Sequence, residues 1–293
     1  MILVTGANGF LGRHICQAIP AQELYTLSRT DARLPVDLAQ PFTLPDRPYT
    51  TVIHAAGKAH SLPRTETEKQ AFYDVNTQGT AHLLQALEQL TQLPESFVLI
   101  STVAVYGLEE GKDITEDAPL RAVSAYGQSK VMAEKLALDW CQKYGVRCTI
   151  LRLPLLAGED APGNLGSMQA AIRKGRFFTI GGGRAHKSMV LAADVAKALI
   201  PLSAIGGVYH LTDGQHPTFR QLGSAMATQS GKKAPGNIPY VLALLASAVG
   251  ELIPGFPLNR SSLRKMTTDL TFDDQKARNT GLWHPQPVLD FYR

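Results

Sequence analysis

The amino-acid sequence predicts an α/β fold: a doubly wound parallel sheet with helices on both faces, joined to a smaller C-terminal lobe. Short apolar segments alternate with helical ones from residue 2 to residue 153, which is typical of right-handed βαβ units in a parallel sheet. The first of these segments passes through a glycine-rich turn into a helix. The chain has 293 residues, 44% of them hydrophobic, so it is long enough to bury a large core.

The glycine-rich turn predicts what the sheet binds. A strand is expected at residues 2–5, and it leads into Gly6, Gly9 and Gly12, spaced G-x-x-G-x-x-G. A helix is expected at residues 13–19. A strand, a glycine turn and a helix in this order place free backbone N–H groups and the positive end of a helix dipole where a pyrophosphate can bind. The turn therefore predicts a Rossmann-type, dinucleotide-binding domain.

The other elements follow from the periodicity of apolar residues. Strands are expected at residues 23–28, 51–57, 96–101, 148–153, 189–191 and 208–211, and helices at 72–90, 126–144, 167–174 and 194–202. On the helix at 126–144 we expect Met132, Leu136 and Trp140 to share one apolar side. The segments at 189–191 and 208–211 are expected to return to the sheet. We therefore expect a cofactor domain of residues 1–156 and 188–212, and a discontinuous substrate lobe of residues 157–187 and 213–293.

Composition argues against several classes of partner. The net charge of +4 is too mild to indicate a nucleic-acid-binding protein. Cys16, Cys141 and Cys148 lie far apart without metal-ligand spacing, so we expect reduced thiols and no metal site. The apolar stretch at 240–258 is short and interrupted by Glu251 and two prolines, which predicts a packed amphipathic helix and no membrane partner. The first strand leaves no room for a signal peptide, so we expect a cytoplasmic protein.

A second motif, Tyr126-x-x-x-Lys130, lies in the helix expected at 126–144. Residues four apart share a face of a helix, and an ammonium beside a phenol favours the phenolate. Such a tyrosine can exchange a proton with an alcohol or a ketone. The preceding strand ends at Ser101 and Thr102, and functional groups gather at the carboxyl ends of parallel strands. The motif is short, and its place after this strand is what makes it informative.

Together these motifs resemble a known family, the extended short-chain dehydrogenase/reductases of the NAD(P)-dependent sugar epimerase/dehydratase type, which are UDP-glucose 4-epimerase-like. The resemblance covers essentially the whole chain, and the motifs occur in the family's order and spacing. They are Thr5-Gly6-x-x-Gly9-x-x-Gly12, His54-Ala55-Ala56-Gly57, Asn76 in V-N-T-Q-G-T, Ser101-Thr102-x-x-Val105-Tyr106-Gly107, Tyr126-x-x-x-Lys130 and Leu151-Arg152-Leu153-Pro154.

The resemblance implies roles for individual residues. Thr102 and Tyr126 would be catalytic, and Lys130 would bind the nicotinamide ribose and lower the pKa of Tyr126. The cofactor would be held by Gly6, Asn8, Gly9, Phe10, Leu11, Gly12, Arg29, Asp37, Leu38, Ala55, Ala56, Asn76, Tyr126 and Lys130. The substrate would be held by Thr102, Asn164, Lys187 and Arg264, with Arg260 and Lys265 as rivals of Arg264.

The cofactor is expected to be NAD(P), with NADP favoured. Relatives that prefer NAD end the second strand with an acid for the ribose 2′-hydroxyl, but here that strand ends Ser28-Arg29, with Arg33 nearby. A guanidinium suits a 2′-phosphate. The alternative is that Arg29 stacks beside the adenine or faces water in an NAD enzyme.

The function that we expect is hydride transfer at a carbinol or keto carbon, C4, of a nucleotide-diphosphate sugar, by an epimerase or a 4-keto reductase. A diphosphate needs cations and amide donors in place of water, which Lys187 and Arg264 would supply. Val103-Ala104 stands where the family's 4,6-dehydratases carry Asp-Glu, which argues against dehydration.

Two alternatives remain open. One is an NADP-dependent ketone or alcohol dehydrogenase that acts on a small molecule without a nucleotide. The other is a non-catalytic protein that senses a dinucleotide. The resemblance also suggests a homodimer that forms through the helices at 72–90 and 126–144.

Overall fold

The central element is a parallel sheet. A computed structural model describes residues 1–59, 63–252 and 259–293, and within these ranges seven parallel strands follow the order β11-β7-β5-β4-β1-β2-β3. The strands are β1 Ile2–Thr5, β2 Leu24–Ser28, β3 Leu34–Pro35, β4 Thr51–His54, β5 Ser96–Thr102, β7 Arg147–Leu153 and β11 Gly207–His210. The order reverses between β1 and β4, and a crevice at such a switch point is where open α/β sheets bind their ligands. The doubly wound parallel fold is confirmed.

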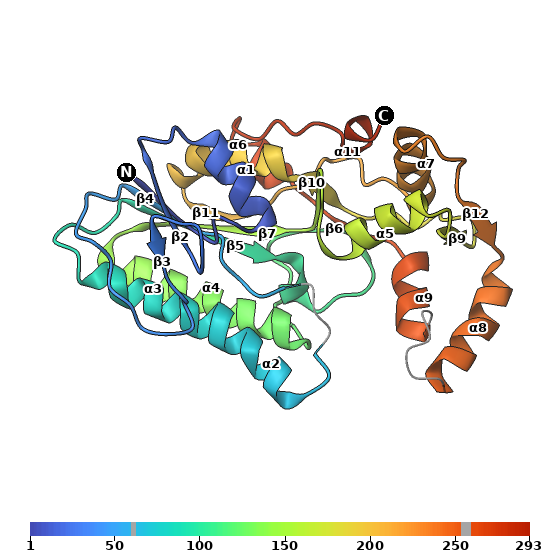
Figure 1. Ribbon diagram of the computed structural model, residues 1–293, viewed down its shortest axis with the longest axis horizontal. Coiled ribbons are helices and arrows are strands. Elements are labelled where there is room, and N and C mark those ends of the chain that lie inside the picture. Colours follow the sequence, from blue (N-terminus) through green and yellow to red (C-terminus); the bar gives the residue numbers. More distant parts are fainter. Residues whose placement is uncertain (60–62, 253–258) are drawn as a thin grey trace.

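Helices cover both faces of this sheet. α1 (Phe10–Ala18) and α6 (Ala192–Ser203) lie on one face, and α3 (Gly79–Glu88) and α4 (Ala125–Tyr144) lie on the other (Figure 1). Each face has its own apolar core. Ile15 and Leu199 belong to the first core, and Leu83 and Trp140 belong to the second. The sheet is therefore enclosed between two apolar layers.

The helix expected at 72–90 is longer and is not regular. α2 (Glu66–Phe72) begins at a capping box in which Thr65 accepts from the N–H of Glu68. A π-helical turn, Tyr73–Gln78, then separates α2 from α3. The periodicity of apolar residues continues through the turn, so it did not reveal the change in winding. Single π-turns inside helices often mark functional sites.

The expected apolar side of α4 was partly wrong. Trp140 is buried, but Met132 is 49% exposed. The buried face carries Ala133 and Ala137 instead, so α4 packs closely through small residues. Together with Leu138, which is also exposed, Met132 leaves a partly apolar outer surface on this helix.

The segment Met189–Leu191 does not return to the main sheet, contrary to expectation. It forms β10, which pairs with β8 (Leu155–Ala157) in a separate two-stranded sheet. Pro154 follows directly after β7, and the chain leaves the main sheet there because proline cannot donate to a ladder. The last strand, β11, does join the main sheet through β7, as expected.

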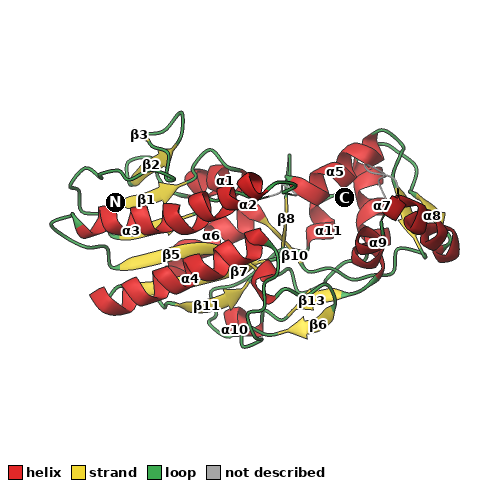
Figure 2. Cartoon of the chain, turned by 90° about the horizontal axis from the view of Figure 1, so that it is seen from below, coloured by secondary structure: helices red, strands yellow, loops and turns green. Residues whose placement is uncertain are grey.

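A smaller lobe adjoins the sheet (Figure 2). Its elements include α5 Gly163–Arg173, β9 Phe178–Ile180, α7 Phe219–Gln229, β12 Gly236–Ile238, α8 Tyr240–Leu252 and α9 Arg260–Thr267. A third pair of strands, β6 Gly111–Ile114 and β13 Leu270–Phe272, joins residues far apart in the chain, and two short helices, α10 Gln275–Arg278 and α11 Val288–Phe291, end the chain. The stretch expected at 240–258 contains α8, and its residues 253–258 lie outside the described ranges.

The C-terminal residues return to the main sheet. Ala277 and Trp283 belong to the core under α1 and α6, and Trp283 is 2% exposed. The assignment of residues 213–293 to the substrate lobe stays a prediction. Part of this range, including Ala277 and Trp283, packs on the main sheet. The described part of the chain contains no helix long and apolar enough to span a membrane.

Candidate active site

The glycine turn after β1 approaches β4 too closely for side chains. Gly6 has φ +70°, and a Cβ there would lie 2.6 Å from the Cα and N of Ala56. A Cβ on Gly12 would lie 2.0 Å from the carbonyl oxygen of Gly6, so helix and turn also require glycine. The contact is fixed by the N–H of Ala56, which donates to Thr5 Oγ1 at 3.2 Å. The turn and the loop after β4 thus form one unit at the switch point.

The N-terminus of α1 is open to an anion. Gly9 precedes the helix in an extended conformation, no side chain caps the helix, and its first turn contains no acid. These N–H groups and the helix dipole would otherwise be satisfied by a capping residue. Together with the close approach at Gly6, they fit the pyrophosphate of a dinucleotide. Asn8 Nδ2 donates to the carbonyl of Thr30 at 2.5 Å, which ties the turn to the loop after β2.

That loop carries the arginines expected at the 2′-end of the cofactor. Arg29 is exposed directly after β2, whereas Arg33 donates to the carbonyl of Ala21 at 3.3 Å. Arg29 is thus the better candidate for a 2′-phosphate. Asp37 accepts from the N–H of Ala39 at 3.1 Å in a turn, and it precedes the buried Leu38, which packs near Gly79.

His54 is a structural residue at the end of β4. Its Nδ1 lies 2.7 Å from Thr5 Oγ1, and its Nε2 lies 2.9 Å from Thr80 Oγ1. Thr80 donates its proton to the carbonyl of Asn76 at 2.6 Å, so its oxygen accepts from Nε2–H, and Nδ1 accepts from Thr5. Burial, assisted by the charge of Lys130, lowers the pKa of His54 to about 3. The imidazole is therefore neutral and links β1, β4 and α3.

Asn76 lies in the π-helical turn and is almost fully buried. Its Oδ1 accepts from the N–H of Lys58 at 2.7 Å, and its Nδ2 donates to the carbonyl of Lys58 at 3.1 Å. The same Nδ2 donates to Ser129 Oγ at 2.9 Å, and Ser129 Oγ in turn donates to the carbonyl of Tyr126 at 2.8 Å. Asn76 therefore joins the loop after β4 to the turn of α4 that carries the tyrosine and lysine motif.

Thr102, Tyr126 and Lys130 are brought together by β5 and α4. Burial raises the pKa of Tyr126 above its usual value, and a hydrogen bond from Thr102 opposes this shift. Lys130 is 3% exposed, and burial lowers its pKa to about 8, although the charge of Glu134 opposes this shift. The expected lowering of the Tyr126 pKa by Lys130 is not found in the protein alone, because burial outweighs the other effects on the phenol. Tyr126 is protonated at neutral pH.

A buried polar network lies behind these residues and was not foreseen from the sequence. Glu134, one turn after Lys130, accepts a bidentate pair from Arg152, with Nε donating to Oε1 at 3.2 Å and Nη2 donating to Oε2 at 2.9 Å, and it also accepts from Ser101. The hydroxyl of Ser101 is therefore engaged with Glu134, whereas the hydroxyl of Thr102, at the end of β5, is the one that hydrogen-bonds to Tyr126. The signal was available, because Glu134 continues the four-residue spacing of Tyr126 and Lys130, but its partner on β7 could not be read from spacing.

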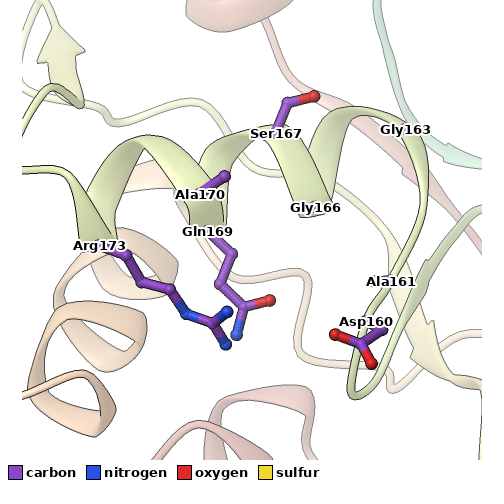
Figure 3. Close-up of a pocket in the computed structure, with 8 residues that line it drawn as sticks. All are labelled: Asp160, Ala161, Gly163, Gly166, Ser167, Gln169, Ala170 and Arg173. Atoms are coloured by element: carbon purple, nitrogen blue, oxygen red, sulfur yellow. The ribbon is translucent and has the colours of Figure 1, made fainter.

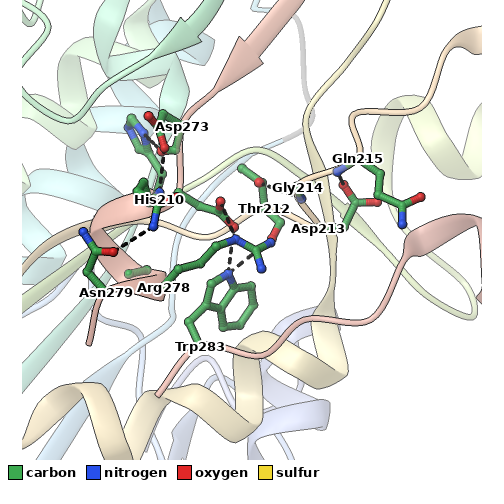
Figure 4. A network of polar contacts seen from close by, with 12 residues as sticks. His210, Thr212, Asp213, Gly214, Gln215, Asp273, Arg278, Asn279 and Trp283 are labelled. Carbon is green, nitrogen blue, oxygen red and sulfur yellow. Dashed lines mark hydrogen bonds and ion pairs between the residues drawn. The ribbon is translucent and has the colours of Figure 1, made fainter. Parts of the chain in front are cut away.

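The network continues to the far edge of the sheet. Arg152 Nη1 donates to Tyr106 Oη at 2.9 Å, and Tyr106 Oη lies 2.6 Å from His210 Nε2. His210 Nδ1 lies 3.0 Å from the carbonyl of Asp273, on the segment that also carries Trp283 (Figure 4). Burial raises the pKa of Tyr106 to about 12 and lowers that of His210. This chain of contacts fixes the base of the site from β5 to the C-terminal segment.

The predicted substrate residues come from different parts of the lobe. Lys187 is buried, and burial lowers its pKa while Asp269 and Glu109 oppose this shift. Arg264, on α9, pairs with Glu110 at 3.0 Å and with Glu109 at 4.0 Å. Glu109 thus lies near both Lys187 and Arg264. Lys265 also pairs with Glu109, at 3.8 Å.

Asn164 is exposed in the first turn of α5. A hollow beside this helix is shown in Figure 3, where Gln169 and Arg173 point toward the turn that carries Asp160. The hollow is lined by Asp160, Ala161, Gly163, Gly166, Ser167, Gln169, Ala170 and Arg173. None of Thr102, Tyr126 and Lys130 lines it, so it is separate from the expected reacting centre.

The three cysteines are free, as expected, but two of them are neighbours. Cys141, near the end of α4, and Cys148, on β7, share a hydrogen bond, which raises the pKa of Cys141 and lowers that of Cys148. The expectation that all three lie apart was therefore wrong, because α4 turns back directly into β7. Within the described ranges, no group of histidine, cysteine and acidic side chains could hold a metal ion.

The sheet order and the glycine turn at its switch point define a dinucleotide-binding protein of the Rossmann type. Residues 2–204 match the NAD dependent epimerase/dehydratase family, and the chain belongs to this family. The expected resemblance is thereby confirmed.

Relatives of different activity cover nearly the whole chain. The N-acetyl-alpha-D-glucosaminyl-diphospho-ditrans,octacis-undecaprenol 4-epimerase of Escherichia coli O157:H7 is 27% identical, over 97% of this chain and 90% of that one. The 4-hydroxy-2-methyl-3-oxo-4-farnesyl-3,4-dihydroquinoline-1-oxide ketoreductase of Stigmatella aurantiaca is 29% identical, over 94% and 89%. The crystal structure of the Thermus thermophilus UDP-glucose 4-epimerase with NAD shares the fold, with a TM-score of 0.73 and 23% identity over 100% of this chain and 98% of that one.

Proposed function

We propose that the protein is an NAD(P)-dependent enzyme that transfers a hydride at a carbinol or keto carbon of a sugar diphosphate. The observation that carries the proposal is the grouping of Thr102, Tyr126 and Lys130 at the carboxyl edge of the sheet, which is also the edge at which β1 leads into the uncapped N-terminus of α1. Bound NAD(P) would supply the hydride donor or acceptor. Gly6, Gly9 and Gly12 would allow the pyrophosphate to approach, and Lys130 would bind the nicotinamide ribose.

The residues of this chain would manage the proton. Tyr126 is protonated in the protein alone, so its Oη is ready to donate a proton to a keto oxygen. Thr102 Oγ1 would hold the same oxygen by a hydrogen bond. In the reverse direction Tyr126 would act as the phenolate and accept the proton of the alcohol, and the ammonium of Lys130 would stabilise this phenolate.

The site also bears on the type of reaction. Val103 and Ala104 form the short helical turn after Thr102, where elimination of water would need an acid and a base. We therefore propose epimerisation or keto reduction and not 4,6-dehydration. If the oxidised cofactor stays bound during purification, this result would support epimerisation. Turnover that consumes added NADPH would support reduction.

The substrate is proposed to carry a diphosphate, which Asn164, Lys187 and Arg264 would bind. Two kinds of sugar diphosphate fit this proposal. In one, the diphosphate links the sugar to a nucleoside. In the other, it links the sugar to a polyprenol, as in the substrate named for the E. coli relative. Titration with UDP, with TDP and with a short-chain polyprenyl diphosphate distinguishes the two. Binding of none of these would overturn the sugar-diphosphate proposal.

A second candidate is reduction of a small ketone that has no diphosphate. The observation that favours it is the pairing of Arg264 with Glu110, because this cation already has a partner in the protein. The negative charges of Asp269 and Glu109 also act on Lys187. The relative from S. aurantiaca, which matches over most of both chains, is named as a ketoreductase. NADPH-dependent turnover of such a ketone, without binding of UDP, TDP or a polyprenyl diphosphate, would support it.

A Tyr126→Phe substitution tests whether the protein is an enzyme of this type. The variant should bind cofactor as the unaltered protein does and should lose turnover by about two to four orders of magnitude. Unchanged turnover would show that another group handles the proton, and absent turnover in both proteins would favour a dinucleotide-sensing role.

The exposed Met132 and Leu138 on α4 support the proposed homodimer. They place large apolar side chains on the outside of one of the two helices expected at the interface. Light scattering on a Met132→Glu variant tests this contact, and a protein that is monomeric before the substitution would refute it.

A further inference from the structure

α8 packs against the lobe through its small residues and turns its large apolar residues outward. Ala243 is 1% exposed and Ser247 is 0% exposed, and the core that they face contains Leu263. The exposed large residues of α8 are Tyr240, Val241, Leu242, Leu244, Leu245 and Val249, which are between 41% and 65% exposed. A surface helix ordinarily buries its large apolar side chains and exposes polar ones. This helix has the opposite arrangement, which indicates an apolar partner outside the protein.

The lobe that carries α8 is basic. Residues 157–187 and 213–293 contain 14 basic and eight acidic residues, which gives a net charge of +6. Eleven of the basic residues lie between positions 173 and 265, namely Arg173, Lys174, Arg176, Arg184, Lys187, Arg220, Lys232, Lys233, Arg260, Arg264 and Lys265. The whole chain has a net charge of +4, so the rest of the molecule is net negative. The positive charge is therefore concentrated on the lobe, where it attracts an anionic surface.

Part of this charge lies next to α8. β9 and β12 run parallel, with Phe178 opposite Gly236, and residues 174–176 and 232–234 are the segments that lead into these two paired strands. Lys174, Arg176, Lys232 and Lys233 are all exposed. α8 begins two residues after β12 ends, and both elements lie at the outer end of the lobe (Figure 1). The four cations, which we call the basic edge, and the exposed face of α8 thus occupy one end of the molecule.

We propose that α8 and the basic edge dock on the surface of an anionic lipid bilayer, with α8 lying in the plane of the interface. Its large aliphatic side chains would enter the boundary between headgroups and acyl chains, and the basic edge would meet the headgroup phosphates. The sequence predicted no membrane partner because the stretch at 240–258 is unsuited to span a bilayer. That expectation concerned a helix that crosses the bilayer. A helix that lies in the plane of the interface does not need an apolar stretch of that length.

Other occupants fit the same surface less well. A second copy seated symmetrically on α8 would bring two basic lobes together, and like charges would oppose the contact. A single-stranded nucleic acid would suit the cations, but its bases stack on aromatic side chains, whereas α8 presents aliphatic ones after Tyr240. The surface docking does not depend on the proposed function, since neither cofactor nor substrate takes part in it.

The test is co-sedimentation of the full chain with extruded vesicles, without cofactor or sugar. Vesicles of phosphatidylcholine alone are compared with vesicles that contain about one third phosphatidylglycerol. We expect binding to the anionic vesicles, and we expect it to fall at least tenfold at high salt because the cations act within a Debye length. The Leu242→Ser/Leu245→Ser variant should bind roughly a hundredfold more weakly, at about tenfold for each buried leucine side chain.

Matched variants separate the two contributions. Lys232→Gln/Lys233→Gln should weaken binding to anionic vesicles roughly thirtyfold, at about 1 kcal/mol for each cation. The control is Ile200→Ser/Ile205→Ser, which removes two exposed isoleucines of the cofactor domain and should bind as the unaltered protein does. Thermal unfolding of each variant shows that it is folded.

Three outcomes would overturn the proposal. The first is the absence of binding to anionic vesicles at low salt, and the second is unaltered binding by the Leu242→Ser/Leu245→Ser variant. The third is an oligomer of the unaltered protein, seen by light scattering, that does not bind vesicles and that dissociates in the Leu242→Ser/Leu245→Ser variant. A second copy of the chain would then cover α8. Turnover of a sugar diphosphate tests the proposed function, and vesicle binding tests the proposed docking surface. Each proposal can therefore fail without the other.

Discussion

Asn76 donates its amide to the hydroxyl of Ser129 at 2.9 Å, and this hydrogen bond joins the π-helical turn to the middle of the Tyr126-x-x-x-Lys130 motif. Both residues are buried, so each would leave an unsatisfied polar group if the other were removed. The same amide group of Asn76 holds both backbone groups of Lys58, on the loop that follows β4. The position of the motif relative to the switch point of the sheet is therefore set by one side chain.

An Asn76→Ala substitution should lower kcat/KM by about ten- to a hundredfold and destabilise the fold by about 1–3 kcal/mol, since it leaves several buried polar groups without partners. Steady-state kinetics and urea unfolding measure the two effects. Gln78→Ala, an exposed position in the same turn, is the control and should change neither. Equal losses in the two variants would mean that the turn itself, and not the amide of Asn76, is responsible.

Lys130 is expected to destabilise the protein without cofactor. Its pKa is lowered from 10.5 to about 8, so folding disfavours the ammonium. The unfavourable contribution is complete below pH 8, where it amounts to about 3 kcal/mol, and it disappears as the pH rises from 8 to 10.5. Lys130→Met should therefore raise the free energy of unfolding at pH 7, and the gain should shrink toward pH 10.

Urea unfolding at pH 7 and at pH 10 measures this difference, with the exposed Lys135→Met as the control. A gain from Lys130→Met that does not depend on pH would show that better apolar packing, and not the charge, is its origin. The variant should also lose turnover, because the proposed enzyme needs the ammonium for the ribose and the phenolate.

The Glu134–Arg152 pair should show strong coupling. Both side chains are nearly inaccessible, at 2% and 8% exposed, and Arg152→Met alone would leave the carboxylate buried without its partner. We expect that variant to lose about 3–5 kcal/mol of stability, and we expect Glu134→Gln/Arg152→Met to recover part of the loss. A double-mutant cycle by urea unfolding gives the coupling energy, and purely additive losses would argue against a coupled pair.

Arg29 should decide the choice of cofactor. If its guanidinium binds a 2′-phosphate, Arg29→Ser should raise the Kd for NADPH by roughly tenfold or more and leave that for NADH unchanged. Fluorescence titration with both dinucleotides measures this ratio. Arg33→Ser is the matched control, because the guanidinium of Arg33 is held by the carbonyl of Ala21. A protein that prefers NADH before any substitution would show that Arg29 has another role.

Much of the fold could be predicted because it depends on local patterns. β1, the glycine turn and α1 follow from apolar residues and glycines within one short stretch, and β5 and β7 were placed to within one residue. The π-helical turn could not be predicted, because the apolar spacing of a helix continues through it. β10 was assigned to the wrong sheet because three apolar residues carry no information about their partner strand.

The positions of the site residues could be predicted from the sequence, but their protonation states and distant partners could not. Thr102, Tyr126 and Lys130 stand in motifs with fixed spacing, and the structure places them on the expected strand and helix. The protonated state of Tyr126 and the neutral His54 depend on burial, which appears only when the layers are assembled. The pairing of Arg264 with Glu110 joins residues more than 150 positions apart, and no local pattern could have shown it.

The return of the C-terminal segment has a consequence for the order of folding. Ile2 and Val4 belong to the same core as Ala277 and Trp283, so contacts within this core join residues more than 270 positions apart. Because so long a loop must close before these contacts form, the face of the sheet under α1 and α6 gains the last part of its apolar covering late in folding. Until then, that apolar surface is open to association with other unfolded chains.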